Sequence, residues 1–430
     1  MKTFSQWIMY ELITSNQYNL LNLMLVTRAY KYELDPNNRQ RTHLHQHAGV
    51  ARFAYNWGLE HRIRLFQTNH GTERFTDAMK QHRVLNSLKK TQFPWMYQCS
   101  KCAPQEALID LQRAFKNFYR GLKAGRKVGF PRFKRKGVRD SFRLTGTIRF
   151  HKRAIQLPRL GVIRIKERRR SYYKGRILSV TARRRADRWF VSVTVEEEIP
   201  NPTFPTGGSV GVDLGIKTLA TLSNSTTFPN PRALGRRIRK LKQLSRGLSR
   251  KRKWSKNREK AQLRLAKMHL RVFNIRQDTL HKVTTYLAQN HSKIVIEDLN
   301  VSGMLKNRKL ARAIADVGFY EFRRQLVYKC LWYGSELIVV SNVFPSSKMC
   351  SCCGNRKKEL SLSERDYNCE ACGLRIDRDL NAALNLVAVS LPETENACGE
   401  DVKLLASPLG DAMKQTSMKQ EPNISPRLDV

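Results

Sequence analysis

Residues 211–222 read GVDLGIKTLATL and place one carboxylate, Asp213, in an apolar run that Gly211 and Gly215 interrupt. The pattern predicts a strand, a turn and a second strand. Burying a carboxylate in such a run is costly unless a cation compensates its charge. The chain has 80 Lys and Arg against 35 Asp and Glu, so most acids could pair with a surplus base. The sequence therefore raises the question of which cation lies beside Asp213.

Two other acids stand in a similar context, each at the end of a regular element. Glu297 ends the apolar run KIVIE (293–297), and Asp379 lies in DRDLNAALN (377–385), where we expect a helix to begin. Only a fold that joins a first strand, a later strand and a C-terminal helix would bring the three acids together. Such oxygen ligands suit Mg²⁺ or Mn²⁺, and two of these ions can activate water and stabilise the leaving oxygen of a phosphodiester.

The sequence alone leaves alternatives open at this site. Asp298 and Asp377 are near-equivalent choices for the second and third acids. Any of these acids could instead cap a helix or pair with an arginine. The hypothesis to test is that the cation beside Asp213 is a metal ion.

Two cysteine-rich stretches, CSCCG (350–354) and CEACG (369–373), have the spacing of a zinc site. Each supplies two thiols separated by two residues, and the four candidate ligands are Cys350, Cys353, Cys369 and Cys372. Gly354 and Gly373 suit the tight turn that such a pair needs. We expect Cys352 to be a bystander. The polar residues around both stretches argue against cysteines in a hydrophobic core.

The remaining cysteines give weaker signals. The pair in CSKC (99–102) has no second pair nearby, so we expect a structural or accidental role. Cys330 lies on the periodic face of an expected helix and is predicted to be in the core. Closely spaced pairs without a secretion signal favour metal thiolates in a reducing compartment over disulfides. We therefore expect a cytoplasmic protein.

The formal net charge of +45 predicts a polyanionic partner. A membrane surface is the competing polyanion, but the chain lacks an apolar run of about 18 residues that could span a bilayer. Residues 1–23 are apolar but interrupted by polar side chains and lack a cleavage site, so we reject a signal peptide. Met24 could be the true start. We therefore expect nucleic acid as partner, no membrane and no small-molecule substrate.

Periodicity divides the chain into segments of different secondary structure. Residues 26–34 read as a strand, 38–123 as mainly helical, 140–200 as an antiparallel β-unit and 201–208 as a linker. Strand, turn and strand follow from residue 210, and a helical stretch covers about 231–290. Its leucines and Trp254 predict one apolar side. Later elements are expected at 293–296 (strand), 319–333 (helix), 337–340 (strand) and 379–389 (helix).

Several motifs together resemble the TnpB (OrfB) proteins of insertion sequences, which are compact relatives of type V CRISPR effectors. The motifs are GVDLGIKTLATLS, IVIEDLNVSGM, FPSSKMCSCCG, YNCEACG and DRDLNAALNL. RAYKYELDPNN, GVARFAYNWGLEHR, GFPRFKRKG and RWFVSVTVE extend the match, which runs in order from about Met24 to Leu386. The first 23 residues lie outside it.

The resemblance implies a multidomain α/β and α+β fold: an RNase H-like (RuvC) nuclease with an inserted zinc ribbon, behind a β-barrel wedge domain that carries a helical insertion. The implied parts are the first wedge strand (24–37), a helical recognition lobe (38–124), the wedge barrel (125–200), the nuclease (208–344 and 377–389), its basic helical insertion (231–290) and the zinc ribbon (345–376). Residues 1–23 would be an extension or a misassigned start, and 390–430 a disordered tail.

The resemblance also implies an activity and its residues. Asp213, Glu297 and Asp379 match the catalytic, Mg²⁺-binding (or Mn²⁺-binding) carboxylates, and the four cysteines match the Zn²⁺ ligands. The family binds a guide RNA and cleaves DNA that pairs with it, and we interpret its older name, "transposase", as historical. The resemblance also implies a prokaryotic protein that is nucleoid-associated when bound to DNA. We expect nucleic-acid contacts in two basic segments, 125–137 and 231–276, and near the site; the candidates are Lys127, Arg132, Lys134, Arg236, Arg237, Lys251, Lys253, Lys348 and Arg378.

Two other functions remain open on the sequence. One is a guide-independent DNA nuclease or recombinase for branched or single-stranded DNA. The other is a zinc-containing nucleic-acid-binding regulator without activity.

Overall fold

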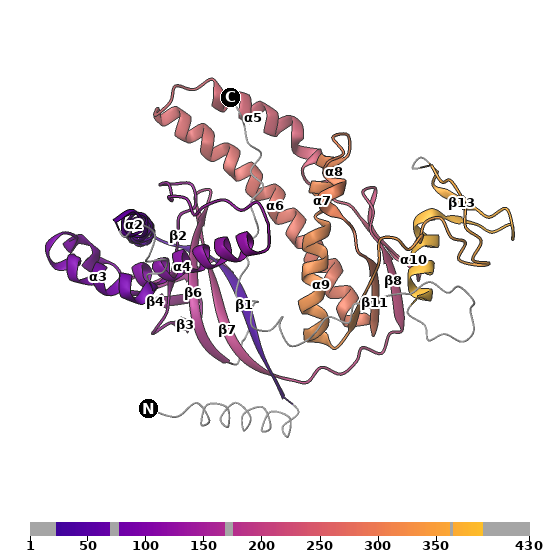
Figure 1. Cartoon of the computed structure of the whole chain (residues 1–430), viewed down its shortest axis with the longest axis horizontal. Helices are drawn as coiled ribbons and strands as arrows, with labels where there is room; N and C mark the ends of the chain where they lie inside the picture. The colour runs from indigo at the N-terminus through magenta and orange to yellow at the C-terminus, as the bar shows by residue number, and fades with distance from the viewer. Residues whose placement is uncertain (1–22, 69–76, 168–174, 362–363, 390–430) are drawn as a thin grey trace. The chain divides into compact units, whose positions relative to one another are not determined.

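The computed structural model describes residues 23–68, 77–167, 175–361 and 364–389 (Figure 1). The chain divides into two compact units, residues 1–201 with 240–271, and residues 202–239 with 272–430. The predicted N-terminal extension, up to residue 22, and the predicted disordered tail lie outside the described residues. Within the described ranges, no helix combines the length and apolar character needed to cross a membrane.

The first unit contains a seven-stranded antiparallel sheet in the order β2-β6-β7-β1-β5-β4-β3. Its strands are β1 (Leu23–Asp35), β2 (Ser141–Leu144), β3 (Arg149–His151), β4 (Ala154–Leu157), β5 (Gly161–Ile165), β6 (Gly175–Arg185) and β7 (Arg188–Pro200). As the alternating pattern predicts, Val191, Val193 and Val195 are buried. β2 and β3 are the terminal strands of this order, so a closed wedge barrel stays a prediction.

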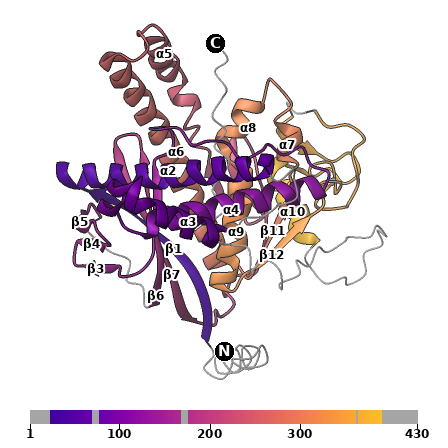
Figure 2. The same cartoon turned by 60° about the vertical axis from the view of Figure 1, so that its left-hand side comes forward.

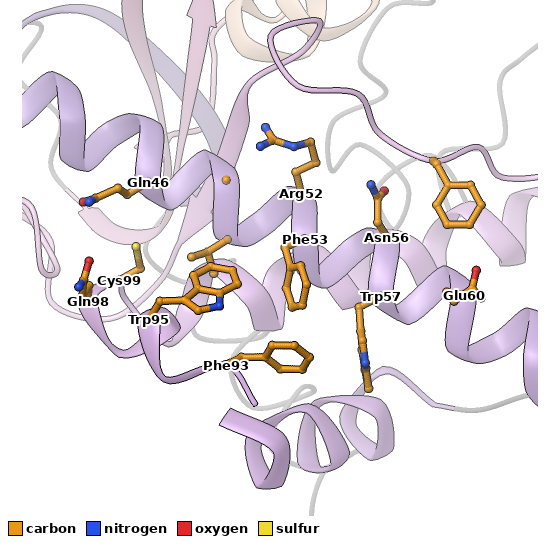
Figure 3. A pocket seen from close by; sticks show the side chains of 13 residues that line it. Gln46, Arg52, Phe53, Asn56, Trp57, Glu60, Phe93, Trp95, Gln98 and Cys99 are labelled. Carbon is orange, nitrogen blue, oxygen red and sulfur yellow. The ribbon is translucent and has the colours of Figure 1, made fainter. Parts of the chain in front are cut away.

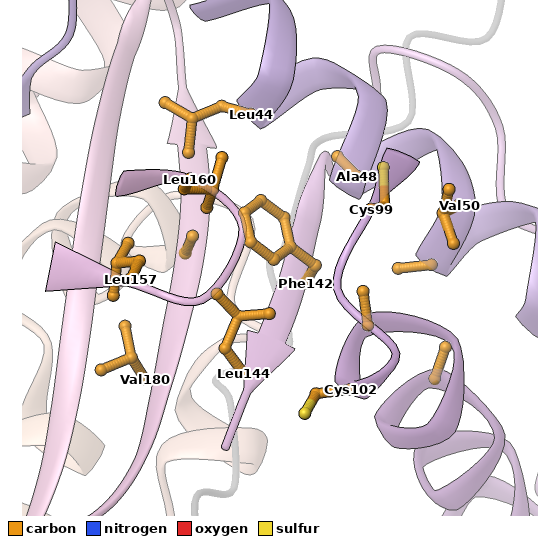
Figure 4. Close-up of a cluster of buried hydrophobic side chains, with 14 of the residues drawn as sticks. Leu44, Ala48, Val50, Cys99, Cys102, Phe142, Leu144, Leu157, Leu160 and Val180 are labelled. Carbon is orange, nitrogen blue, oxygen red and sulfur yellow. The ribbon is translucent and has the colours of Figure 1, made fainter. Parts of the chain in front are cut away.

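A helical segment joins β1 to β2. It consists of α2 (Asn38–Thr68), α3 (Ala78–Thr91), the 3₁₀ helix η1 (Pro94–Gln98) and α4 (Cys102–Lys123), and Figure 2 shows α2 as one uninterrupted helix. This agrees with the helical region expected after residue 38. Apolar side chains of α2 and α4 form one core with those of the sheet, including Phe142 and Leu144 of β2 (Figure 4).

The cysteines of the CSKC pair belong to this core. Cys99 and Cys102 are buried, and the Cys102 thiol donates a hydrogen bond to the Thr145 carbonyl over 3.4 Å. Burial raises the pKa of Cys99 to about 11, which keeps it a neutral thiol. These observations agree with a structural role for the pair.

The second unit contains a mixed five-stranded sheet in the order β10-β9-β8-β11-β12. Its strands are β8 (Ser209–Asp213), β9 (Thr218–Leu222), β10 (Thr227–Pro229), β11 (Lys293–Glu297) and β12 (Glu336–Val340). β8, β9 and β10 are antiparallel, whereas β8, β11 and β12 run parallel. The sequence predicted four of these strands and missed β10, which is only three residues long.

The two faces of this sheet carry different helices, and alternation along each strand decides which side chain meets which helix. Val210 and Val212 share a core with apolar residues of α6 (Lys256–Asn290) and α9 (Phe319–Tyr333). Gly211 lies on the opposite face, under α10 (Arg378–Ala388). A Cβ atom at Gly211 would lie 1.9 Å from the carbonyl oxygen of Ala383, so only glycine lets α10 approach β8 this closely. Cys330 is buried in the core of α6 and α9, as predicted.

The basic stretch 231–290 is helical but not continuous. It forms η2 (Gly235–Arg237), α5 (Ile238–Ser249) and α6, with a turn at residues 250–255. The prediction that Trp254 belongs to the apolar side is wrong, because it lies in this turn and is 96% exposed. Two short helices, α7 (Val301–Met304) and α8 (Ala311–Val317), were not predicted. The cysteine-rich region adds β13 (Asp366–Asn368) paired with β14 (Arg375–Asp377).

Candidate active site and cysteine metal centre

The three predicted carboxylates lie at the ends of three packed elements. Asp213 ends β8 and Glu297 ends β11, each one residue beyond the paired residues Val212 and Ile296 of these parallel strands. Both acids therefore emerge at the same edge of the sheet. By strand alternation they lie on the same face as Gly211, the face that α10 covers. Asp379 is in the first turn of α10, which packs against β8, β9 and β11.

The charges of Asp379 and Glu297 both act on Asp213, although among the described residues only the four cysteines bring three or more candidate metal ligands within 4.8 Å of one another. Burial, followed by the charges of Asp379 and Glu297, raises the pKa of Asp213 to about 8, and Arg378 opposes this shift. Asp213 keeps some exposed surface at the sheet edge, but protein atoms surround its carboxyl group. The Arg378 Nε atom lies 3.8 Å from the Asp379 carboxylate. One arginine beside three acids leaves an excess of negative charge.

The two acids that the sequence could not separate from this set have other partners. Asp377 caps α10, because its carboxylate accepts hydrogen bonds from the backbone N–H groups of Asp379 (2.9 Å) and Leu380 (3.0 Å). Asp298 forms an ion pair with Arg323. Asp298 and Asp377 thus have structural roles of their own, and the assignment of Glu297 and Asp379 as metal ligands stays a prediction.

A buried polar network, which sequence reasoning missed, holds Glu297 in place. The Ser346 hydroxyl donates a hydrogen bond to the Glu297 carboxylate, and Ser346 is only 2% exposed. The side-chain amide of Asn385, also 2% exposed, donates to the backbone carbonyls of Ser346 and Met349, each over 2.7 Å. Asn381, one helical turn earlier, donates to the same Met349 carbonyl over 2.7 Å. α10 thus fixes the segment that leads into the first cysteine pair.

A signal for this network exists in the sequence. The two asparagines are four residues apart and so lie on one face of α10, within the motif LNAALN (380–385). Buried amides on an otherwise apolar face need hydrogen-bond partners, but the sequence does not show which segment supplies them.

The four predicted cysteine ligands come together in the structure. Their sulfur atoms all lie within 4.8 Å of one another, with Cys350 and Cys372 at 3.6 Å and Cys353 and Cys369 at 3.5 Å. Cys352 is exposed and outside the cluster. A compact set of four sulfurs on two turns matches what zinc requires.

The two cysteine turns are built alike. Gly354 has a φ of +72° and Gly373 a φ of +73°, in the left-handed region that favours glycine. Each glycine N–H donates over 3.0 Å to the carbonyl of the first cysteine of its pair. Both turns can therefore present two sulfurs to the same side.

The predicted nucleic-acid contacts fall into two groups. Six are exposed side chains: Lys127, Arg132, Lys134, Arg236, Lys251 and Lys253. Of these, Lys134 also contacts an aromatic ring, since its ammonium lies 3.9 Å from the centre of the Tyr55 ring. The three half-buried residues have partners within the protein: Lys348 donates to the Lys358 carbonyl, Arg237 to the Ala233 carbonyl and Arg378 to the Ser361 carbonyl. The exposed group stays the better candidate for phosphate contacts.

An aromatic groove in the first unit was also missed (Figure 3). It has a volume of about 810 Å³, and its aromatic lining is Phe53, Trp57, Phe93, Trp95 and Phe133. The Phe53 ring centre lies 4.8 Å from that of Phe93 and 5.1 Å from that of Trp95. The groove joins residues of α2 to residues near η1 and on the loop after α4, which are distant in the chain, so the sequence of α2 alone does not indicate it.

Comparison with known proteins decides the family. Residues 190–308 match a family model described as "Probable transposase" (OrfB of IS605), and residues 319–386 match "Cas12f1-like, TNB domain". A Streptomyces pristinaespiralis "Putative RNA-guided DNA endonuclease" is 37% identical over 92% of this chain and 96% of its own length. The Escherichia coli K12 "Putative RNA-guided DNA endonuclease InsQ" is 34% identical over 87% and 95%. This chain belongs to the TnpB (OrfB) family.

Two further likenesses concern parts of this TnpB-family fold. Residues 24–71 match a family model described as "Helix-turn-helix domain". In the structure, the described part of that range is the strand β1 followed by the single 31-residue helix α2. A chain in a solved Cas12f1–sgRNA–target DNA complex aligns with 85% of this chain and 99% of its own, at 14% identity and a TM-score of 0.49.

Proposed function

We propose that this TnpB-family protein is a transposon-encoded, RNA-guided DNA endonuclease that hydrolyses phosphodiester bonds with divalent metal ions. The observation that carries the proposal is the set of three carboxylates at the sheet edge, where burial, followed by the charges of Asp379 and Glu297, raises the pKa of Asp213 to about 8. Relatives that align over nearly the whole chain carry names with this activity. The net charge of +45 suits two nucleic-acid partners.

The residues of the carboxylate site fit divalent cations, because three acids face a single arginine and need more positive charge. Bound there, two Mg²⁺ or Mn²⁺ ions would supply an activated water and stabilise the leaving oxygen of the DNA strand. Asp213, Glu297 and Asp379 would hold them. Ser346 orients the Glu297 carboxylate, and Arg378 attracts that of Asp379.

We further propose the family's domain assignment for this chain. The second unit, with acids at the ends of a first strand, a later strand and a C-terminal helix, would be the RuvC-like nuclease. The four clustered thiols would hold one Zn²⁺ in a ribbon at residues 345–376. Residues 24–37 and 125–200 would form the wedge domain, with the helical lobe 38–124 inserted in it.

The exposed side chains suit a protein that leaves recognition of the DNA sequence to a guide RNA. A guide RNA reads the target by base pairing, so the protein needs cations for the backbones more than side chains for base edges. The exposed Lys127, Arg132, Arg236, Lys251 and Lys253 suit that role. The aromatic groove beside α2 offers ring faces for unpaired or splayed bases.

The test uses the protein purified with its co-expressed RNA and a DNA that matches the guide. Asp213→Asn, Glu297→Gln and Asp379→Asn should each reduce Mg²⁺-dependent cleavage to background while RNA binding stays intact. Asp278→Asn is the matched control, because this exposed acid on α6 pairs with Lys282 one turn away on the same helix, and the variant should cut like the wild type.

The outcomes separate the candidate functions. Full cleavage by Asp213→Asn would show that the metal site is misassigned. Cleavage that persists without the bound RNA and ignores target sequence would indicate a guide-independent nuclease. Tight RNA and DNA binding without hydrolysis in Mg²⁺ or Mn²⁺ would indicate a binding regulator.

A further inference from the structure

A turn joins α5 to α6 (Figure 1), and it carries a tryptophan among basic residues. Trp254 is 96% exposed, the highest value among the exposed large apolar side chains of the described residues. Four consecutive basic residues, 250–253, precede it, and Lys256 follows. Residues 231–258 contain no acid. The indole therefore lies in a strongly positive, water-exposed setting.

The backbone of Trp254 is unfavourable for a bulky residue. Its φ is +69°, in the left-handed region that β-carbon sterics disfavour. The turn is fixed without the indole, because the Arg258 guanidinium donates to the Leu248 and Lys251 carbonyls, each over 3.0 Å. A tryptophan that is strained and fully hydrated contributes no burial to the fold, so its chemistry points to a ligand.

The setting defines that ligand. A flat aromatic surface binds another flat aromatic group by stacking, and the surrounding ammonium and guanidinium groups bind phosphates. Bases inside a duplex cover each other's faces, so the accessible partner is an unpaired base. We propose that Trp254 stacks on an unpaired nucleobase of bound RNA or DNA while residues 250–253 neutralise adjacent phosphates. This rests on the proposed function only in taking nucleic acid as the partner.

Stacking would give the turn between α5 and α6 a role beyond that of its charge. Lysine and arginine alone would hold a strand anywhere along its backbone, since every phosphate is alike. A stacking residue at the turn would instead mark one position on the strand by interrupting its base stack. The test must therefore separate the contribution of the bases from that of the phosphates.

The experiment measures fluorescence anisotropy of labelled single-stranded DNA and RNA of equal length, each also made with abasic residues. The full-length chain is freed of bound nucleic acid by a high-salt wash, and its fold is checked by circular dichroism. Trp254→Ala should weaken binding of base-containing strands by roughly 5- to 150-fold. It should change binding of abasic strands little, and Trp254→Phe should retain most of the affinity. The RNA and DNA arms show which strand the indole prefers.

The matched control is the double variant Lys251→Gln/Lys253→Gln. It should weaken both kinds of strand and reduce the salt slope by about 0.7 for each phosphate that a lysine no longer neutralises. Trp254→Ala should leave that slope unchanged, because it removes no charge. In addition, Trp254→Gly should raise Tm by relieving the strained backbone, which would confirm that the indole does not support the fold.

Equal binding of base-containing strands by Trp254→Ala and the wild type would overturn the proposal, as would an equal weakening on base-containing and abasic strands. Binding to anionic phospholipid vesicles that needs Trp254, when oligonucleotide binding does not, would assign the turn to a membrane surface instead. These assays need no cleavage. If the protein cuts guide-matched DNA and Trp254→Ala binds strands as the wild type does, only this inference is wrong. If the protein does not cut DNA but needs Trp254 to bind strands, only the nuclease proposal is wrong.

Discussion

The cysteine cluster and the carboxylate group are two candidate metal sites that the chain builds in opposite ways. The cysteines lie within residues 350–372, and two similar glycine turns present their sulfurs. The carboxylates come from β8, β11 and α10, and a sheet register, a close helix approach at Gly211 and a buried serine position them. One site is local in sequence, and the other depends on tertiary structure.

This difference concerns what holds each site before metal binds. The cysteine region has two short strands and few apolar residues, so a metal bound to its four thiols would supply much of its folding free energy. The carboxylates are attached to a sheet with two helix-covered faces, so they are held together despite their repulsion. Metal removal should therefore unfold the first site but leave the second folded and electrostatically strained.

The largest effect is expected from breaking the zinc site. Cys369→Ser should reduce zinc from about one per chain and unfold the ribbon, because structural zinc contributes about 10–16 kcal/mol of apparent binding free energy. Cleavage should fall as well, since the segment from Ser346 to Met349 that α10 fixes continues directly into the ribbon. Metal analysis, protease sensitivity and cleavage assays measure these effects.

Cys352→Ser, in the first cysteine turn, provides the matched control. This thiol is exposed and outside the cluster, so the variant should keep its zinc, its protease resistance and its activity. A Cys369→Ser protein that keeps full zinc and an intact ribbon would contradict the comparison, because the sulfur set would then not be the metal site.

A smaller, opposite effect on stability is expected at the carboxylates. Without Mg²⁺, burial and the charges of Asp379 and Glu297 raise the pKa of Asp213 from 3.8 to about 8. The folded state then holds its proton more tightly than the unfolded state. The stability that Asp213 contributes is complete below about pH 4 and is lost as the pH rises towards 8. Asp213→Asn should remove this loss and stabilise the metal-free protein at pH 7 by up to about 4 kcal/mol.

Thermal unfolding from pH 5.5 to 8 tests this, in buffer without Mg²⁺ or chelator so that zinc stays bound. The wild type should lose stability relative to Asp213→Asn as the pH rises, and added Mg²⁺ should close the gap. Parallel stability curves for the two proteins would contradict the raised pKa. Mg²⁺ should not restore the protease resistance of the ribbon in Cys369→Ser, which separates the two sites.

The same contrast explains what the sequence could predict. Spacing alone identifies the four cysteines, because two C-x₂-C turns place their sulfurs through local geometry. Apolar periodicity likewise predicts β8, β11, α9 and α10 nearly to their ends. The choice between Asp377 and Asp379, or between Glu297 and Asp298, could not be made by spacing. It depends on a helix cap and on an ion pair with Arg323, which only the fold shows.

Other features were missed for a related reason. Apolar periodicity placed Trp254 on a helix face, but the turn held by Arg258 interrupts the helix there. The aromatic groove combines residues from α2, η1 and a loop, so no single stretch of the sequence indicates it. The hydrogen bond from Ser346 to Glu297 joins residues 49 apart in sequence. In each case the deciding interaction is between segments, and the sequence shows each segment alone.

The smallest expected effect concerns the link between the two sites. Ser346→Ala removes the hydroxyl that donates to Glu297 and leaves the four cysteines, α10 and the other carboxylates unchanged. Loss of a residue that orients a metal ligand typically costs 10- to 100-fold in metal affinity. We therefore expect about that increase in the Mg²⁺ concentration for half-maximal cleavage, with little change in the rate at saturating Mg²⁺.

Calorimetric Mn²⁺ binding gives a second readout of Ser346→Ala that does not depend on cleavage. Ser347→Ala is the control, since this neighbour has the same side chain and no hydrogen bond to Glu297, and it should bind metal like the wild type. Zinc content should stay at about one per chain in both variants. An unchanged Mn²⁺ affinity in Ser346→Ala would mean that the sheet alone positions Glu297. The ribbon and the carboxylates would then be independent sites that merely share α10, because within the described residues no other side-chain hydrogen bond runs from the segment before the cysteines to a candidate catalytic acid.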